Sequence, residues 1–182
     1  QVLVVTSSRP DEGKSVIARA LAKRLVQQHR GRVLLIDGSA EDPAGHAGSR
    51  AQGRPGFFDL LREPKTHASA VVSRSESRLH LLGTGPNRAP SLVYPESTRK
   101  ARLRKMRERY HWTIVDAGTL PQLGSLARQA DGVLLVVDAA NTRREVVKGA
   151  IESARLPMGK LLGAVLNRRP QYVPAWAYRH WL

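Results

Sequence analysis

The chain has 182 residues, a formal net charge of +15 and no cysteine. Its length suits one α/β domain with its own core, and the composition excludes a disulfide framework, a thiolate metal site and a membrane-length apolar run. The charge indicates an anionic partner, such as nucleotide, lipid headgroups, nucleic acid or an acidic protein, although arginine used generously on solvated faces explains it equally well.

Short apolar runs predict the strands, at residues 2–5, 33–36, 79–82, 112–115, 133–137 and 161–166. Most are continuous rather than alternating, which is typical of strands buried on both faces of a parallel sheet. Helical spacing lies between them at residues 15–28, 97–110 and 143–155, and Thr142 with Glu145 forms a capping-box pattern. Strands that alternate with helices predict an α/β fold, with one mostly parallel sheet and helices on both faces.

The remaining segments are predicted to be loops and a tail. Residues 38–55 and 83–90 are rich in small residues and proline, which predicts loops. We expect one domain at residues 1–169, followed by an aromatic tail at 170–182. Because the chain begins at Gln1, directly inside an apolar run, we expect it to be a fragment of a longer protein.

The stretch SSRPDEGKSV, residues 7–16, joins the first predicted strand to the first predicted helix. It ends in Gly13-Lys14-Ser15, as a phosphate-binding loop does, but Ser8 stands where the first glycine of that loop is expected. Backbone N–H groups of such a loop suit phosphate oxygens. In this arrangement Lys14 would reach the β and γ phosphates, and the hydroxyl of Ser15 would bind Mg²⁺.

Two acids directly follow predicted strands, Asp37 after 33–36 and Asp116 after 112–115. Ligands of open parallel sheets bind beyond the carboxyl ends of the strands, and two carboxylates there are what a magnesium–phosphate site needs. Either acid alone could merely start a turn or cap a helix.

The sequence resembles the cytoplasmic kinase domain of bacterial tyrosine kinases, which are deviant P-loop ATPases related to the chromosome-partitioning and septum-site ATPases. The resemblance covers nearly the whole chain and is carried by TSSRPDEGKS, VLLIDGSAEDP, RERYHWTIVDAG, ADGVLLVVDAANTRREVV and LLGAVLNR. It implies an ATP-dependent protein-tyrosine kinase of exopolysaccharide or capsule biosynthesis, with ATP or ADP and Mg²⁺ as cofactors.

The resemblance also implies roles for individual residues. Lys14, Asp37 and Asp116 would be catalytic, and Ser15 would join the two aspartates in binding magnesium. Asn167, which closes the last predicted strand, would contact the adenine. The full set expected to contact nucleotide is Ser8, Arg9, Pro10, Asp11, Glu12, Gly13, Lys14, Ser15, Val16 and Asn167.

The implied partner is a polysaccharide co-polymerase, the membrane protein that determines chain length. The resemblance further implies a homo-oligomer at the cytoplasmic face of the bacterial inner membrane. The basic helix at 97–110 indicates either contact with anionic headgroups or a solvated outer face. No DNA-reading module is recognisable, so a sequence-specific nucleic acid partner is not expected.

The chain departs from the family pattern at several positions. Asp11 replaces a usual glycine, but aspartate tolerates the left-handed region, so the turn can form. Ser39 replaces the second acid of an Asp-x-Asp motif, and because serine is no general base at neutral pH, we expect weakened catalysis. Gly118 replaces a proline and is expected to loosen a turn. The tyrosine cluster that ends the family's kinases is reduced to Tyr172 and Tyr178.

Two other functions stay open on the sequence. One is a non-catalytic, nucleotide-gated regulator of a polysaccharide co-polymerase. The other is a partitioning-type ATPase that binds DNA or membrane, against which stands the absence of a lysine near the start of the loop, where Ser8 and Arg9 lie.

Overall fold

The computed structural model describes residues 1–39, 55–63, 73–74, 78–86, 94–157 and 159–169. The expected aromatic tail, with Tyr172 and Tyr178, and most of the loop at 38–55 therefore lie outside the described residues. Among the helices that are described, none has the length and apolar character needed to cross a lipid bilayer.

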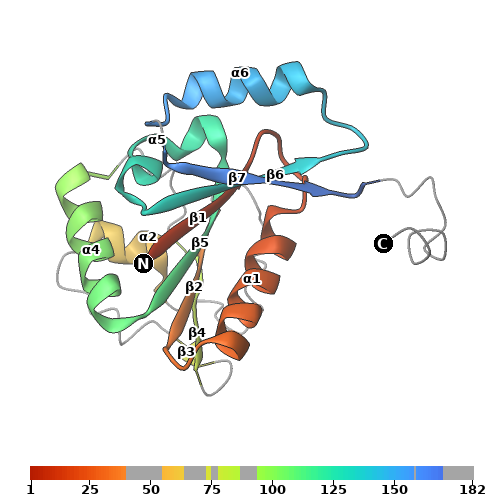
Figure 1. The fold of residues 1–182 in the computed structure, drawn as a ribbon. Helices are drawn as coiled ribbons and strands as arrows, with labels where there is room; N and C mark the ends of the chain where they lie inside the picture. The colour runs from red at the N-terminus through yellow and green to blue at the C-terminus, as the bar shows by residue number, and fades with distance from the viewer. Residues whose placement is uncertain (40–54, 64–72, 75–77, 87–93, 158, 170–182) are drawn as a thin grey trace, which may run out of the picture.

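A single sheet forms the centre of the molecule, with strand order β3-β4-β2-β5-β1-β6-β7 (Figure 1). Its neighbouring strands are all parallel except the two-residue β3, which pairs antiparallel with β4 at one edge. The strands are β1 Val2–Ser7, β2 Val33–Gly38, β3 Ser73–Arg74, β4 Leu79–Leu82, β5 Trp112–Thr119, β6 Gly132–Asp138 and β7 Leu161–Asn167. The predicted α/β fold, with its mostly parallel sheet, is confirmed.

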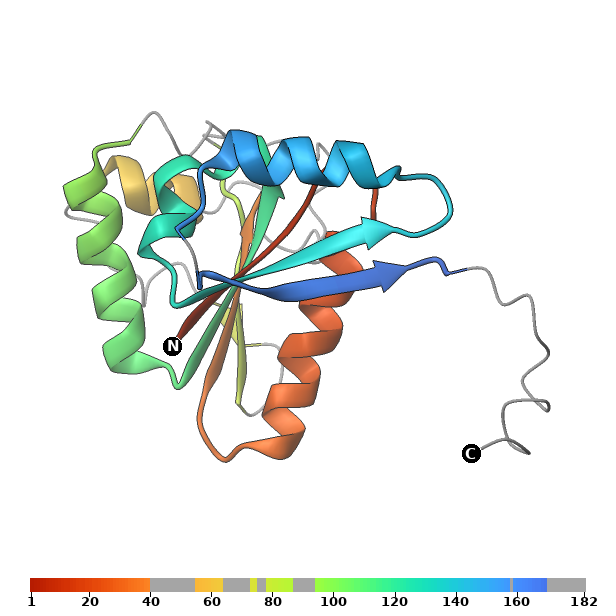
Figure 2. The ribbon, with the colours of Figure 1, turned by 45° about the horizontal axis from the view of Figure 1, so that its top comes forward.

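Helices cover both faces of this sheet, as predicted (Figures 1 and 2). The described helices are α1 Lys14–Gln28, α2 Phe57–Arg62, α4 Glu96–Arg109, α5 Leu120–Gln129 and α6 Arg144–Ala154. The apolar side of α1 packs against one face, where Ala18, Ala22 and Leu25 meet strand residues such as Val5 and Ile114. The other four helices pack against the opposite face and form the larger core.

All the predicted strands and helices are present, but some expectations about their ends are wrong. The capping box does not form, because no side chain caps α6 and the hydroxyl of Thr142 instead donates to Glu12. Gly118 loosens no turn, because it lies within β5, where its carbonyl accepts a hydrogen bond of 2.8 Å from the Thr6 hydroxyl.

The basic helix α4 is only partly a solvated face. Arg102 is buried, and its guanidinium donates to the carbonyls of Leu60 at 2.9 Å and Glu63 at 2.7 Å. These carbonyls close the C-terminal end of α2, where a cation is favoured by the helix dipole. Arg107 similarly binds the carbonyl of Gln129, the last residue of α5. Part of the arginine content therefore joins the helices to one another.

Candidate functional site

The predicted phosphate loop connects the carboxyl end of β1 to the start of α1. Strand β1 lies between β5 and β6, and the chain runs to one side of it through β2 and to the other through β6. Such a switch point is where open α/β sheets bind ligands. No described side chain caps the N-terminus of α1, and its first turn contains no acid. A helix start of this kind suits a phosphate group.

The backbone of the loop depends on two residues in the left-handed region. Asp11 has φ of 60° and Gly13 has φ of 90°. The expectation that aspartate can replace glycine in this turn is thus confirmed, and the Asp11 side chain is exposed. Gly13 cannot be replaced so easily, because an added Cβ would lie 2.1 Å from Nδ2 of Asn167.

Asn167 lies against the loop, at the end of β7. Its amide donates a hydrogen bond of 2.9 Å to the carbonyl of Glu12. The other expected nucleotide contacts differ in exposure: Ser8, Glu12 and Lys14 are buried, whereas Arg9, Pro10 and Val16 are exposed. The structure thus brings the end of the last strand and the loop after the first strand together.

The two predicted acids lie side by side. Asp37 and Asp116 are register partners on the neighbouring parallel strands β2 and β5, so their side chains leave the sheet on the same face. The hydroxyl of Ser15, in the first turn of α1, donates a hydrogen bond to Asp116. The three residues predicted to bind magnesium are therefore neighbours in the fold.

The environment of Asp116 disfavours its charge. The pKa of this carboxyl is raised from 3.8 to about 6, mainly by burial and also by the charge of Asp37. The Ser15 hydrogen bond and the charges of Lys14 and Arg19 oppose this shift. Its Oδ1 is buried and has no hydrogen-bond partner among the described residues. An unpartnered buried carboxylate oxygen beside a second carboxylate is suited to a cation.

Ser39 follows β2 directly and is also buried, with 3% of its surface exposed. Its backbone N–H donates to Oδ1 of Asp37 at 3.4 Å, while its own Oγ finds no partner in the part of the chain that the structure describes. The position at which the family pattern has an acid therefore lies close to the acid pair.

Sequence reasoning missed Asp138 and Arg168. Asp138 ends β6 and forms an ion pair of 2.9 Å with Arg168, which follows β7. Hydrogen bonding from Asn141 and the contact with Arg168 hold the pKa of Asp138 below its ordinary value. An acid directly after the run at 133–137 was the available signal, since the same signal identified Asp37 and Asp116.

Comparison with known proteins identifies relatives along almost the whole chain, although no protein-family model matches it. Tyrosine-protein kinase YwqD of Bacillus subtilis (strain 168) is 29% identical over 169 residues, which cover 91% of this chain and 71% of YwqD. The crystal structure of the VpsO kinase domain has a TM-score of 0.74 at 26% identity, covering 93% of this chain and 85% of that domain. The chain is a homologue of the bacterial tyrosine kinases.

A further relative is a much longer protein than this chain. Succinoglycan biosynthesis transport protein ExoP of Rhizobium meliloti (strain 1021) is 28% identical over 175 residues, which cover 92% of this chain but 22% of ExoP. The kinase-like region is thus only a part of that relative.

Proposed function

We propose that the chain is an ATP-dependent protein-tyrosine kinase domain that acts in exopolysaccharide or capsule biosynthesis. The observation that carries this proposal is the convergence of Lys14, Ser15, Asp37 and Asp116 at the carboxyl ends of β1, β2 and β5. The names of YwqD and ExoP supply the reaction and the pathway class. Kinase homologues favour this function over a non-catalytic regulator.

Ser15, Asp37 and Asp116 would hold Mg²⁺ together with the nucleotide phosphates. Magnesium at such sites typically takes one or two carboxylates and completes its coordination with phosphate and water. The buried, unpartnered Oδ1 of Asp116 fits this role. Consistent with a site completed by its ligand, the described residues contain no group of three or more His, Cys, Asp or Glu side chains that could hold a metal ion alone.

The same assignment also gives expected roles to Lys14, Asn167 and position 39. Lys14 would contact the β and γ phosphates, and the backbone from Ser8 to Val16 would surround them. Asn167 would contact the adenine from the end of β7. With Ser39 in place of the acid, position 39 offers no carboxylate to take the proton of an attacking hydroxyl, so turnover should be slower than in a site with aspartate there, by about 10²–10⁴-fold.

We also propose that the domain works as a homo-oligomer with a polysaccharide co-polymerase at the cytoplasmic face of the inner membrane. ExoP supports the link to polysaccharide transport, since a region similar to this chain forms part of that protein. The exposed cations of α4, among them Lys100, Arg104 and Lys105, favour contact with anionic headgroups.

Titration calorimetry with ADP, with and without Mg²⁺, tests the nucleotide site. We expect magnesium-dependent binding that Lys14→Met abolishes and that Lys23→Met, an exposed lysine on α1, leaves unchanged. Incubation with ATP and an anti-phosphotyrosine blot then tests kinase activity. The proposal would be contradicted if the parent chain released no heat at millimolar ADP. It would also be contradicted if Lys14→Met bound ADP as tightly as the parent chain.

A further inference from the structure

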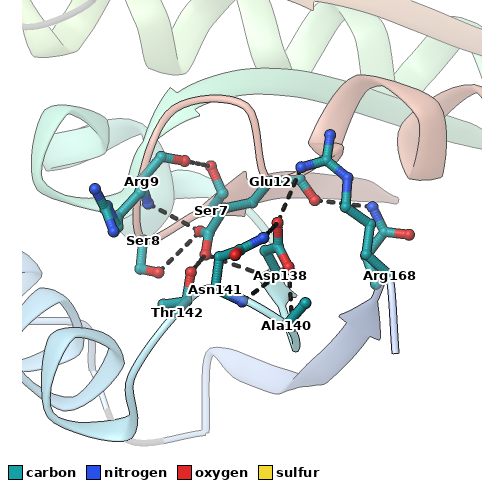
Figure 3. A network of polar contacts seen from close by, with 10 residues as sticks. Ser7, Ser8, Arg9, Glu12, Asp138, Ala140, Asn141, Thr142 and Arg168 are labelled. Atoms are coloured by element: carbon teal, nitrogen blue, oxygen red, sulfur yellow. Dashed lines mark hydrogen bonds and ion pairs between the residues drawn. The ribbon is translucent and has the colours of Figure 1, made fainter. Parts of the chain in front are cut away.

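Glu12 belongs to the phosphate loop, but its carboxylate is directed into the protein. Only 3% of the residue is exposed. Figure 3 shows the side chain surrounded by hydrogen-bond donors from its own loop and from the chain after β6. Its Oε2 accepts from the Ser8 hydroxyl at 2.8 Å and from the Arg9 N–H at 2.9 Å. Its Oε1 accepts from the Asp138 N–H at 3.2 Å and from the Thr142 hydroxyl.

These contacts hold Glu12 in its charged form. Burial alone would raise the pKa of this carboxyl, but hydrogen bonds led by that of Thr142 outweigh burial and lower the pKa. A carboxylate with four donors is a poor proton acceptor, which argues against a role as general base. Both of its oxygens already accept hydrogen bonds from protein donors, which argues against a direct contact between this side chain and nucleotide.

The hydrogen-bond network around Glu12 extends to β6 and β7, the two strands that follow β1 in the sheet order. The backbone carbonyl of Glu12 accepts from Asn167 at the end of β7. Asp138, whose N–H binds Glu12, accepts from the N–H groups of Ala140 and Asn141 and pairs with Arg168. The phosphate loop is therefore fastened to the ends of β6 and β7, more than a hundred residues away in the chain.

We propose that Glu12 is a positioning residue, which fixes the phosphate loop in its binding conformation by fastening it to Thr142 and to the end of β6. The inference rests on the proposed nucleotide binding. Asp11 has a left-handed φ, which costs a non-glycine residue free energy and is kept when surrounding contacts hold the loop in place. A loop that is already ordered loses less entropy when a ligand binds, so the network strengthens nucleotide affinity.

Thr142 is the residue through which this inference can be tested, because its hydroxyl donates to the Glu12 carboxylate while Thr142 itself lies outside the loop. Thr142→Val removes the hydroxyl and keeps the branched shape, and we expect ADP with Mg²⁺ to bind at least tenfold more weakly. Thr142→Ser restores the donor and should bind ADP as the parent does. Thr98→Val, at a half-buried position on α4, is the matched control and should leave affinity unchanged.

A double-mutant cycle separates positioning from general loss of stability. Glu12→Gln replaces one acceptor oxygen by a donor, and it should weaken ADP binding by at least as much as Thr142→Val. The combined variant should be no weaker than Glu12→Gln alone, because both changes break one network. Urea midpoints of all variants are measured alongside, since a purely structural role would move the midpoint without this pattern in ADP affinity.

The outcomes distinguish the inference from the function on which it rests. If the parent chain binds ADP and Thr142→Val binds it equally well, the positioning role is wrong and the proposed function stands. The same conclusion follows if Thr142→Ser is as weak as Thr142→Val, or if the two single effects simply add. If the parent chain fails to bind ADP, both the proposed function and the role of Glu12 are overturned.

Discussion

Asp116→Asn should stabilise the ligand-free chain while abolishing magnesium-dependent nucleotide binding. Burial and the neighbouring Asp37 hold the pKa of Asp116 near 6, against an ordinary value of 3.8. In the unfolded chain this carboxyl ionises near its ordinary value, whereas in the folded chain it keeps its proton to higher pH. The stability of the parent chain should therefore fall as the pH rises from about 4 to about 6, and the full cost remains at higher pH.

The size of the effect follows from the two pKa values. Each tenfold change in proton affinity is worth about 1.4 kcal/mol, so ionised Asp116 costs the folded state roughly 3 kcal/mol. Asparagine avoids this cost but leaves a buried amide hydrogen without a partner where Oδ1 lies, which costs about 1–2 kcal/mol. We expect the free energy of unfolding to rise by about 1–2 kcal/mol near pH 8.

Urea denaturation in the presence of a chelator, at several pH values, provides the measurement. The quantity compared is the difference between variant and parent, because other acids titrate over the same range. Asp131→Asn is the control with the opposite sign. Hydrogen bonds from Arg107 and from the N–H of Val2 outweigh burial and lower the pKa of Asp131, so its contribution is present above its ordinary pKa and is lost as the pH falls. The reasoning fails if Asp116→Asn is no more stable than the parent near pH 8, or if the difference between them does not grow between about pH 4 and 6.

Three further predictions concern catalysis, packing and the basic surface. Ser39→Asp should raise the rate of ATP hydrolysis or autophosphorylation at least tenfold, about 1.4 kcal/mol of barrier, with little change in ADP affinity; an unchanged rate would mean that more than one catalytic group is missing. Arg102→Met should lower the free energy of unfolding in urea by about 2–4 kcal/mol, because its buried charged hydrogen bonds are lost, whereas the exposed Arg104→Met should change it by less than about 0.5 kcal/mol. Replacing Lys100, Arg104 and Lys105 by glutamine should weaken the free energy of binding to anionic liposomes by roughly 3 kcal/mol at low salt, measured by flotation. Equal flotation of variant and parent would exclude α4 as the membrane contact.

Most of the sheet could be predicted from the sequence because its strands are apolar runs, which burial on both faces of the central strands requires. The two-residue β3 was missed because Ser73 and Arg74 form no apolar run, and the edge strand β7 leaves Leu162 and Leu166 exposed. Helices α1, α4 and α6 were predicted because their apolar residues recur at helical spacing. Helix α5 was missed because it begins directly after β5 without a turn signal, and Pro121 with Gly124 reads as a loop. The short α2 was missed because six residues are too few for a helical period to be recognised.

Residues of the candidate site could be predicted where a local sequence pattern marks them, and could not where the contact joins segments far apart in the chain. Asp37 and Asp116 could be found because each directly follows an apolar run in the sequence. Gly13 and Lys14 could be found because the Gly-Lys-Ser motif precedes an amphipathic helix, and both signals are local patterns. The contact of Glu12 with Thr142 spans 130 residues, and no local pattern encodes it. The pattern at Thr142 even misled, since a threonine three residues before Glu145 predicts a helix cap, but the hydroxyl finds a buried carboxylate instead.

The charge balance around the acid pair explains how this chain could keep nucleotide binding while losing rate. Asp37 and Asp116 already repel each other in a buried site, and this repulsion helps to raise the pKa of Asp116. A third carboxylate at position 39 would add to that repulsion in the absence of a cation, because Ser39 is itself buried beside Asp37. Serine avoids this cost to the ligand-free fold, and the two remaining carboxylates with Ser15 still suffice for a magnesium ion that also binds phosphate. Binding and turnover therefore depend on different residues of the same sheet edge, which is why ADP affinity and reaction rate should respond separately to substitution at position 39.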